Sequence, residues 1–272
     1  MLNKTIVIAE AGENHCGNMQ LAYDLIDMSA RSGCDYVKFQ LYDAAKASSA
    51  DPEKEWFKKV EVSDEMWIDL IDYSKKAGIL PLATPWDKEK AEVILKSGAT
   101  DIKIASFHIV DHELLQFVNA NFNRVFLSTG MSSINEIERA VDTLKDVKDL
   151  FVLHCVSEYP LPPEHVNLNI IPTLQNKFPN VSGIGYSDHT IGIFAPVLAV
   201  SMGATVIEKH ITTDKNLEGT DHILSADGTE LPEMVRQIRL AETMLGTNEK
   251  HLTASEKENQ EFLRERFHNV PT

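Results

Sequence analysis

The sequence has few cysteines, no long apolar run and few basic residues, and each shortage excludes a class of protein. Cys16, Cys34 and Cys155 are an odd, scattered set without a CxxC pair. They are typical of a reducing compartment, so we expect a cytoplasmic protein without a cysteine-based metal site. No apolar stretch approaches the length of a membrane span, and Met1 leads directly into an apolar strand. We therefore expect neither a membrane protein nor a secretion signal.

Basic residues are outnumbered by acidic ones. The chain has 26 Lys and Arg against 41 Asp and Glu, which gives a formal net charge of -15 at pH 7. Because nucleic acids and anionic membranes bind to basic faces, we expect neither as a partner. A small anion held in a locally basic pocket is compatible with this charge.

Strand-like apolar runs alternate with helical runs along the whole chain. Several helical runs end in a glycine before the next strand, as expected for the turns of an α/β protein. We count eight strand–helix units, the number that closes a parallel barrel, and 272 residues suit one such domain. The predicted strands are Thr5–Gly12, Cys34–Tyr42, Ile79–Trp86, Thr100–Phe107, Arg124–Gly130, Leu150–Ser157, Val181–His189 and Thr205–Thr212.

We therefore predict the α/β class and a (β/α)8 TIM barrel formed by residues 1–272 as a single domain. An open doubly wound sheet is the alternative, but no GxGxxG follows the first strand. The sequence further predicts a long polar loop over Asp43–Glu61, a helix that begins at Ser63, and a charged helical tail over Ser255–His268.

Two histidines end neighbouring predicted strands, at the edge where parallel barrels carry their catalytic groups. His189 closes one strand and His210 the next, with Asp188 and Glu208 beside them. The two imidazoles are positioned to share a divalent metal. The alternative is a pair of rim histidines that only form hydrogen bonds.

Two lysines lie inside apolar strands, where a charge is costly unless it is paired or bound to a ligand. Lys38 and Lys103 could pair with Glu10 and Glu208 in a structural ion network. Alternatively, the lysines and a ring of hydroxyls hold the phosphate and carboxylate of an anionic substrate. The candidate residues at or just past strand ends are Glu10, Lys38, Thr84, Lys103, Ser106, Ser128, Tyr159 and Ser187.

Together these strand ends resemble the sialic acid synthase family, in its barrel domain. The resemblance covers all eight strands in order, which makes it specific, whereas any single motif is weak. The motifs are AEAGENHCGN (Ala9–Asn18), VKFQ (Val37–Gln40), ATPW (Ala83–Trp86), IKIAS (Ile102–Ser106), LSTGM (Leu127–Met131), LHCVSEYP (Leu153–Pro160), IGYSDHT (Ile184–Thr190), IEKHIT (Ile207–Thr212) and EGTDH (Glu218–His222).

The resemblance implies an enzyme that condenses phosphoenolpyruvate with an amino-sugar-like aldose. The products would be a 2-keto-3-deoxy sugar acid, for surface polysaccharide or glycan biosynthesis, and phosphate. It further implies a divalent metal, manganese or magnesium, on His189 and His210, and catalytic roles for these two histidines, Glu10 and Lys103. The implied substrate-binding residues are Lys38, Gln40, Thr84, Lys103, Ser106, Ser128, Ser157, Tyr159, Ser187 and Asp221.

Three departures from the family pattern concern the sugar side. His108 stands where the family has an acidic residue, and Ser157 stands where it has an asparagine. The family's antifreeze-like domain, which caps the partner subunit's sugar site, does not follow the barrel here. We therefore expect a homodimer formed through the barrel, a separate capping protein, or an open site. The loop Ala44–Glu61 is also unlike the family's sugar-binding loop.

Two other interpretations stay open at this point. One is a different barrel enzyme, either an aldolase or a phosphoenolpyruvate-dependent synthase of the octulosonate-phosphate or heptulosonate-phosphate type. The other is a non-catalytic relic that binds a ligand or a partner enzyme.

Overall fold

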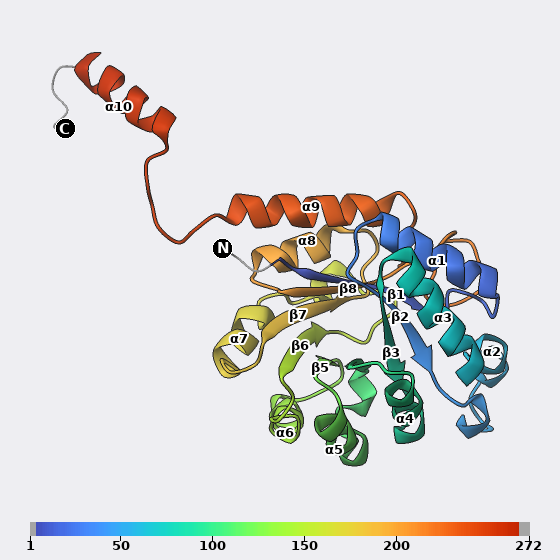
Figure 1. Cartoon of the computed structure of the whole chain (residues 1–272). Helices are drawn as coiled ribbons and strands as arrows, with labels where there is room; N and C mark the ends of the chain where they lie inside the picture. The colour runs from blue at the N-terminus through green and yellow to red at the C-terminus, as the bar shows by residue number, and fades with distance from the viewer. Residues whose placement is uncertain (1–3, 267–272) are drawn as a thin grey trace.

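Eight parallel strands form the centre of the molecule in the computed structural model, which describes residues 4–266 (Figure 1). Each predicted strand is present, with ends one to three residues inside most of the predicted bounds. The strands are β1 (Ile6–Gly12), β2 (Tyr36–Leu41), β3 (Leu80–Pro85), β4 (Asp101–Ile104), β5 (Arg124–Ser128), β6 (Asp149–Cys155), β7 (Gly183–Asp188) and β8 (Val206–His210).

The strands are hydrogen-bonded in the order β3-β2-β1-β8-β7-β6-β5-β4, and every ladder is parallel. The two end strands, β3 and β4, pack beside each other, so the sheet curls into a nearly closed barrel. This confirms the predicted TIM barrel over the open-sheet alternative. The register places Glu10 opposite both Lys38 and His210, and Ser187 opposite Glu208, which collects these residues at one level of the barrel.

Helices surround the barrel, and their ends follow the local sequence. Asn18 caps the first helix and Ser63 the third, each accepting a backbone N–H, and Gly78 ends the third helix with φ of 78°. No helix among residues 4–266 is long and apolar enough to cross a membrane. The helices are α1 (Met19–Arg31), α2 (Lys54–Val60), α3 (Asp64–Ala77), α4 (Lys88–Lys96), α5 (His112–Asn121), α6 (Ile134–Thr143), α7 (Ile170–Lys177), α8 (Phe194–Ser201), α9 (Glu230–Leu245) and α10 (Ala254–Arg266).

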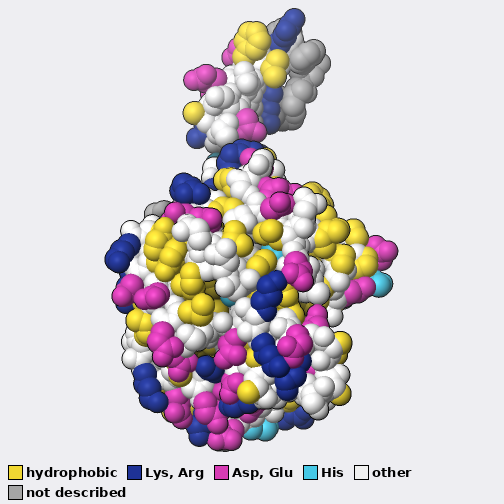
Figure 2. All heavy atoms as spheres, turned by 90° about the vertical axis from the view of Figure 1, so that its right-hand side faces the viewer, with side chains coloured by type: hydrophobic (Ala, Val, Ile, Leu, Met, Phe, Trp, Pro, Cys, Tyr) yellow, Lys and Arg dark blue, Asp and Glu magenta, His cyan; other side chains and the backbone are white. Residues whose placement is uncertain are grey.

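The predicted tail helix is α10, which stands clear of the barrel and buries none of its side chains (Figure 1). It ends at Arg266, and the last two residues predicted for it lie outside the described range. On the face shown in Figure 2, acidic and basic side chains are interspersed.

The prediction of a long polar loop over Asp43–Glu61 is wrong, because this segment contains a short 3-10 turn and helix α2. Seven residues are too few for a helical period to stand out in the sequence. Tertiary contacts hold the helix instead: the Phe57 ring packs against Tyr42 and Trp86, with centroids 5.6 and 5.4 Å away.

A buried polar network joins the ends of β7 and β8 on the side away from the barrel interior. Asp188 and Lys209 are fully buried, and the Lys209 ammonium donates to Asp188 at 2.6 Å. Asp188 also accepts from the Tyr186 hydroxyl at 2.8 Å and from the backbone N–H of Thr190 at 3.0 Å. Because alternate residues of a strand face opposite ways, this network fixes the backbone that presents His189 and His210 inward.

Replacing Lys209 should therefore destabilise the protein strongly. In Lys209→Met the Asp188 carboxylate stays buried without its counter-charge, so we expect the free energy of unfolding to fall by about 3–5 kcal/mol. Urea denaturation followed by circular dichroism measures this. The matched control is Lys88→Met, whose ion pair with Glu113 is on the surface and should cost below about 1 kcal/mol. Equal losses in the two variants would contradict a stabilising role for the network.

Candidate active site

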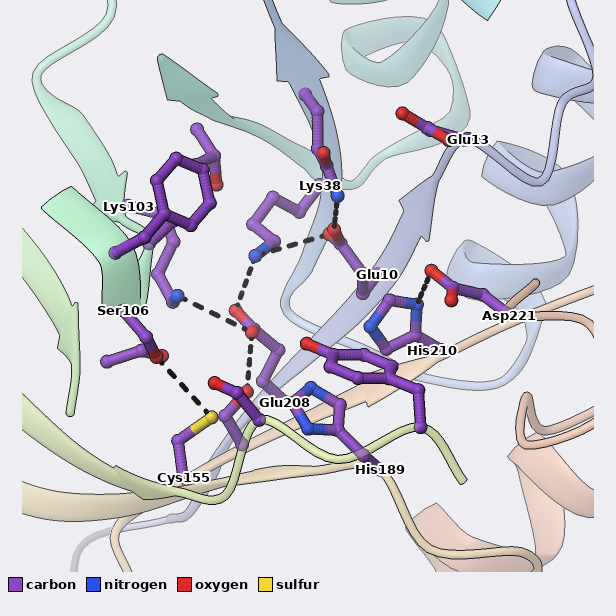
Figure 3. Close-up of a pocket in the computed structure, with 18 of the residues that line it drawn as sticks. Glu10, Glu13, Lys38, Lys103, Ser106, Cys155, His189, Glu208, His210 and Asp221 are labelled. Carbon is purple, nitrogen blue, oxygen red and sulfur yellow. Dashed lines mark hydrogen bonds and ion pairs between the residues drawn. The ribbon is translucent and has the colours of Figure 1, made fainter. Parts of the chain in front are cut away.

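A cavity of about 550 Å³ opens at the carboxyl ends of the strands (Figure 3). This is the end at which barrel enzymes carry their active sites. Every side chain predicted from the sequence to act in catalysis or to bind substrate or metal lies on the wall of this cavity. All eight strands, or the segments that directly follow them, contribute these side chains. They are Glu10, Lys38, Gln40, Thr84, Lys103, Ser106, Ser128, Ser157, Tyr159, Ser187, His189, His210 and Asp221.

The floor of the cavity is a buried ion network centred on Glu208. Its carboxylate lies 2.9 Å from the Lys38 ammonium and 3.6 Å from that of Lys103, and it accepts from the Ser187 hydroxyl at 2.8 Å. Lys38 also lies 3.3 Å from Glu10. These are the partners that the ion-network interpretation of the sequence named. The same lysines line the open cavity, so the pairing leaves them within reach of a ligand.

Burial and the opposing charges set the protonation of this floor. Burial raises the pKa of Glu208, but Lys103 and Lys38 outweigh it and hold that pKa well below its usual range. Burial lowers the pKa of Lys38, whereas the charges of Glu10 and Glu208 reverse this and raise it. Burial lowers the pKa of Lys103 to about 8 and raises that of Glu10 to about 7. At neutral pH two lysines therefore face one full carboxylate and a second, partly protonated one, so the floor suits an anion.

Two hydroxyls at this level have no hydrogen-bond partner among the described residues. The side-chain oxygens of Thr84 and Ser128 are buried without a hydrogen bond, which is costly unless a ligand or water supplies one. Ser106 accepts from the backbone N–H of Gly130 at 2.9 Å and contacts the Cys155 thiol at 3.6 Å. The cavity is thus lined by polar groups with unused hydrogen-bonding capacity.

The two histidines have the protonation that a metal ligand needs. Burial lowers the pKa of His189 to about 4 and that of His210 to about 3, so both rings are neutral at pH 7. The Nδ1 atom of His189 lies 2.7 Å from the Val156 carbonyl, which can only accept, so Nδ1 carries the proton and Nε2 keeps a free lone pair. The two ring centroids are 5.5 Å apart.

His210 adds an unpaired atom to this pair. Its buried Nδ1 makes no hydrogen bond and lies 3.3 Å from the Asp221 carboxylate. Residues 4–266 contain no group of three or more His, Cys, Asp or Glu placed to hold a metal. The neutral rings of His189 and His210 are the two side chains that could supply nitrogen ligands to a divalent ion here.

Ser157 and His108, the two residues that depart from the family pattern on the sugar side, differ in their position relative to the cavity. Ser157 lines the cavity, whereas His108 does not. The Nδ1 atom of His108 is 3.8 Å from the Asp111 carboxylate, and burial lowers its pKa. A neutral histidine that is not part of the cavity wall does not replace the carboxylate that the family pattern places there.

Sequence reasoning missed the outer part of the cavity. Glu13, Glu53, Phe57, Phe107 and Met131 line it but were not nominated. Glu13 lay inside a recognised motif without being singled out. Glu53 and Phe57 belong to the segment that was taken for a loop.

The fold and the floor of the cavity define a class: a parallel-barrel enzyme whose strand ends bring two buried lysines beside two neutral histidines. Comparison with known proteins identifies the family. Residues 25–250 match the model of the NeuB family, so the chain belongs to the NeuB family. This confirms the family resemblance and the prediction of an enzyme of sugar-acid biosynthesis.

Named relatives and a solved structure agree with this assignment. The chain is 36% identical to N,N'-diacetyllegionaminic acid synthase of Campylobacter jejuni, over 97% of this chain and 84% of that one. It is 33% identical to human N-acetylneuraminate-9-phosphate synthase, over 94% and 76%. The crystal structure of N-acetylneuraminic acid synthetase from Leptospira borgpetersenii, in complex with citrate, superposes with a TM-score of 0.90 at 36% identity, covering 98% of this chain and 94% of that chain.

Gly130 provides a test of the anion pocket. A Cβ at this position would lie 2.9 Å from the Ser106 hydroxyl and would collide with that of Ser157, so Gly130→Ala fills the space between them. We expect inorganic phosphate, measured by calorimetry, to bind at least about tenfold more weakly, which corresponds to one lost hydrogen bond to a charged group. The control is Gly228→Ala, whose Cβ would meet only Met28 at 3.6 Å. Unchanged phosphate binding in Gly130→Ala would place the anion elsewhere.

Proposed function

We propose that this enzyme condenses phosphoenolpyruvate with an amino-sugar-like aldose to give a 2-keto-3-deoxy sugar acid and phosphate. The observation that carries the proposal is the buried floor, in which Lys38 and Lys103 share Glu208 beside two neutral histidines. Membership of the NeuB family supports it, because the named relatives are synthases of acidic sugars.

Phosphoenolpyruvate is an anion with a phosphate and a carboxylate, and the floor offers a matching set of groups. Lys38 and Lys103 supply positive charge, and the unpartnered hydroxyls of Thr84 and Ser128 supply hydrogen bonds. In the proposed reaction C3 of phosphoenolpyruvate attacks the aldehyde carbon, water adds at C2, and the C2–O bond to phosphate breaks. The same lysines then stabilise the leaving phosphate.

Glu10 is the candidate for handling the proton of the water that adds at C2. Burial raises its pKa to about 7, which is where a general acid or base works at neutral pH. Gln40 donates to its carboxylate at 3.1 Å and so orients it. We assign Glu10 the proton released by the water, while the aldehyde oxygen gains a proton and becomes the new hydroxyl.

His189 and His210 are the residues that would hold manganese or magnesium. When bound, such an ion supplies Lewis-acid polarisation of the aldehyde oxygen. Tyr159 packs against His189 with ring centroids 3.9 Å apart, and Asp221 lies beside His210, so these two residues border the place where the aldehyde would lie.

The proposal treats residues 1–272 as one barrel domain. We further propose that the protein works in the cytoplasm, where the free thiols of Cys16, Cys34 and Cys155 stay reduced. A homodimer or a separate capping protein would cover the open side of the cavity. The non-catalytic interpretation differs from this proposal in predicting binding without turnover.

Release of inorganic phosphate from phosphoenolpyruvate tests the reaction. With manganese present, we expect release that depends on one or more members of a panel of aldoses, and a product that contains both carbon skeletons by mass spectrometry. Phosphoenolpyruvate that binds by calorimetry but is not turned over with any aldose would support a relic. If phosphoenolpyruvate neither binds nor releases phosphate with any aldose, the proposed reaction is ruled out.

Removing either histidine should abolish metal binding. We expect His189→Ala and His210→Ala to lose bound manganese, measured by titration followed by electron paramagnetic resonance, and to lose activity while keeping the circular dichroism spectrum of the parent. His165→Ala is the matched control, since His165 is exposed and paired with Glu158. Manganese that is retained in both inner variants would show that the ligand assignment is wrong.

A further inference from the structure

We propose that the outer half of the cavity binds an aldose without a phosphate group, and that Glu13 is the residue that selects it. The inference deepens the proposed function, because it concerns the acceptor of the same reaction. It rests on the distribution of charge along the cavity and on the way Glu13 is held.

Charge is divided unevenly between the inner and outer parts of the cavity. Lys38 and Lys103 are the only lysines or arginines on the wall formed by residues 4–266, and both lie at the buried floor. Carboxylates line both parts: Glu10 and Glu208 at the floor, and Glu13, Glu53 and Asp221 further out. In Figure 3 Glu13 stands apart from the ion pairs of the floor.

Glu13 is fixed in place by two aromatic donors. The Tyr42 hydroxyl donates to one carboxylate oxygen at 2.9 Å, and the Trp56 indole N–H donates to the other at 2.6 Å. Each oxygen keeps a further lone pair, because a carboxylate oxygen accepts more than one hydrogen bond. Glu13 is therefore a rigid acceptor that faces the cavity and forms no ion pair with any residue in the range 4–266.

An aromatic wall stands beside this carboxylate. The Trp86 ring packs against Tyr42, with centroids 4.3 Å apart, and against Phe107 at 5.5 Å. Trp86, Phe57 and Phe107 all line the cavity. An aromatic wall beside a fixed acceptor suits a sugar, whose ring face is apolar and whose edge carries hydroxyl or amino donors.

Within the described part of the chain, no lysine or arginine lines this outer region to balance a phosphate on the acceptor. The Lys59 ammonium lies 4.9 Å from the Trp56 ring, but it is paired with Glu218 at 2.7 Å and does not line the cavity. A second anion beside Glu13, Glu53 and Asp221 would meet like charge only, whereas phosphate sites in proteins are built from cations and N–H donors. The family includes a relative named for a 9-phosphate product, so the distinction separates members of the family.

Kinetics with matched acceptors test the inference. The acceptors are mannosamine and N-acetylmannosamine, each with and without a 6-phosphate, with phosphoenolpyruvate and manganese. We expect the parent protein to favour the free sugar by at least about tenfold in kcat/KM, since juxtaposed like charges oppose the ester. Glu13→Gln removes one negative charge and should reduce this preference severalfold, mainly through a higher KM for the free sugar.

Two further variants separate charge from position. Tyr42→Phe removes one hydrogen bond to Glu13 but keeps its charge, so we expect a higher KM for the free sugar and an unchanged preference against the phosphate ester. Glu55→Gln makes the same charge change on the exposed side of α2 and should behave as the parent. A parent that prefers the phosphate ester, or a Glu13→Gln variant with the parental preference, overturns the inference.

Failure of this inference can be told apart from failure of the proposed reaction. If the enzyme turns over the phosphate ester in preference to the free sugar, the proposed condensation still stands and only the role of Glu13 is excluded. If no acceptor is turned over, calorimetry can still compare the binding of each free sugar with that of its 6-phosphate ester. Tighter binding of the free sugar that weakens in Glu13→Gln then supports the subsite, and equal binding of both forms excludes it.

Discussion

Glu208 lies between Lys38 and Lys103 inside the barrel, and its carboxylate provides the counter-charge on which both lysines depend. Each lysine is almost completely buried, where an unpaired ammonium would lose its charge. Because the second carboxylate of the floor, Glu10, is partly protonated at neutral pH, the two lysines keep an excess of positive charge that a substrate anion can satisfy. The network is therefore both the structural partner of the lysines and the reason that the floor can bind an anion, so the two interpretations of these residues describe one arrangement.

The position of this floor depends on the opposite faces of the same strands. Lys209 lies between Glu208 and His210 in sequence and points outward to Asp188, while its two neighbours point into the cavity. Strands thus fix the inner half of the site, whereas the segment that contains α2 and the segments after β1, β3, β4 and β8 build the aromatic and acidic outer half. Barrel enzymes vary their chemistry through such connecting segments, which is where this chain departs from the family pattern.

Most of the fold and the inner site could be predicted from the sequence, because strand period and strand-end position are local properties. Lys38 and Lys103 stood out as charges in apolar strands, and His189 and His210 as polar strand ends. The outer site could not be predicted in the same way. Helix α2 is too short to show a period, and Phe57 reaches the cavity only because Tyr42 and Trp86 receive its ring. His108 shows the opposite case, since its position matches a sugar-side residue of the family, yet it is not part of the cavity wall.

The sequence by itself determined the number and order of the strands, the residues at their ends and the family, because these follow from alternation of side chains along a strand and from short motifs. Only the tertiary structure decided which charges share a partner and which remain open to a ligand. Glu10 and Glu13 are both glutamates of the same segment, separated by two residues. One joins the lysines of the floor and the other is held by Trp56 and Tyr42, because closing the barrel brings β2 to the first and α2 to the second.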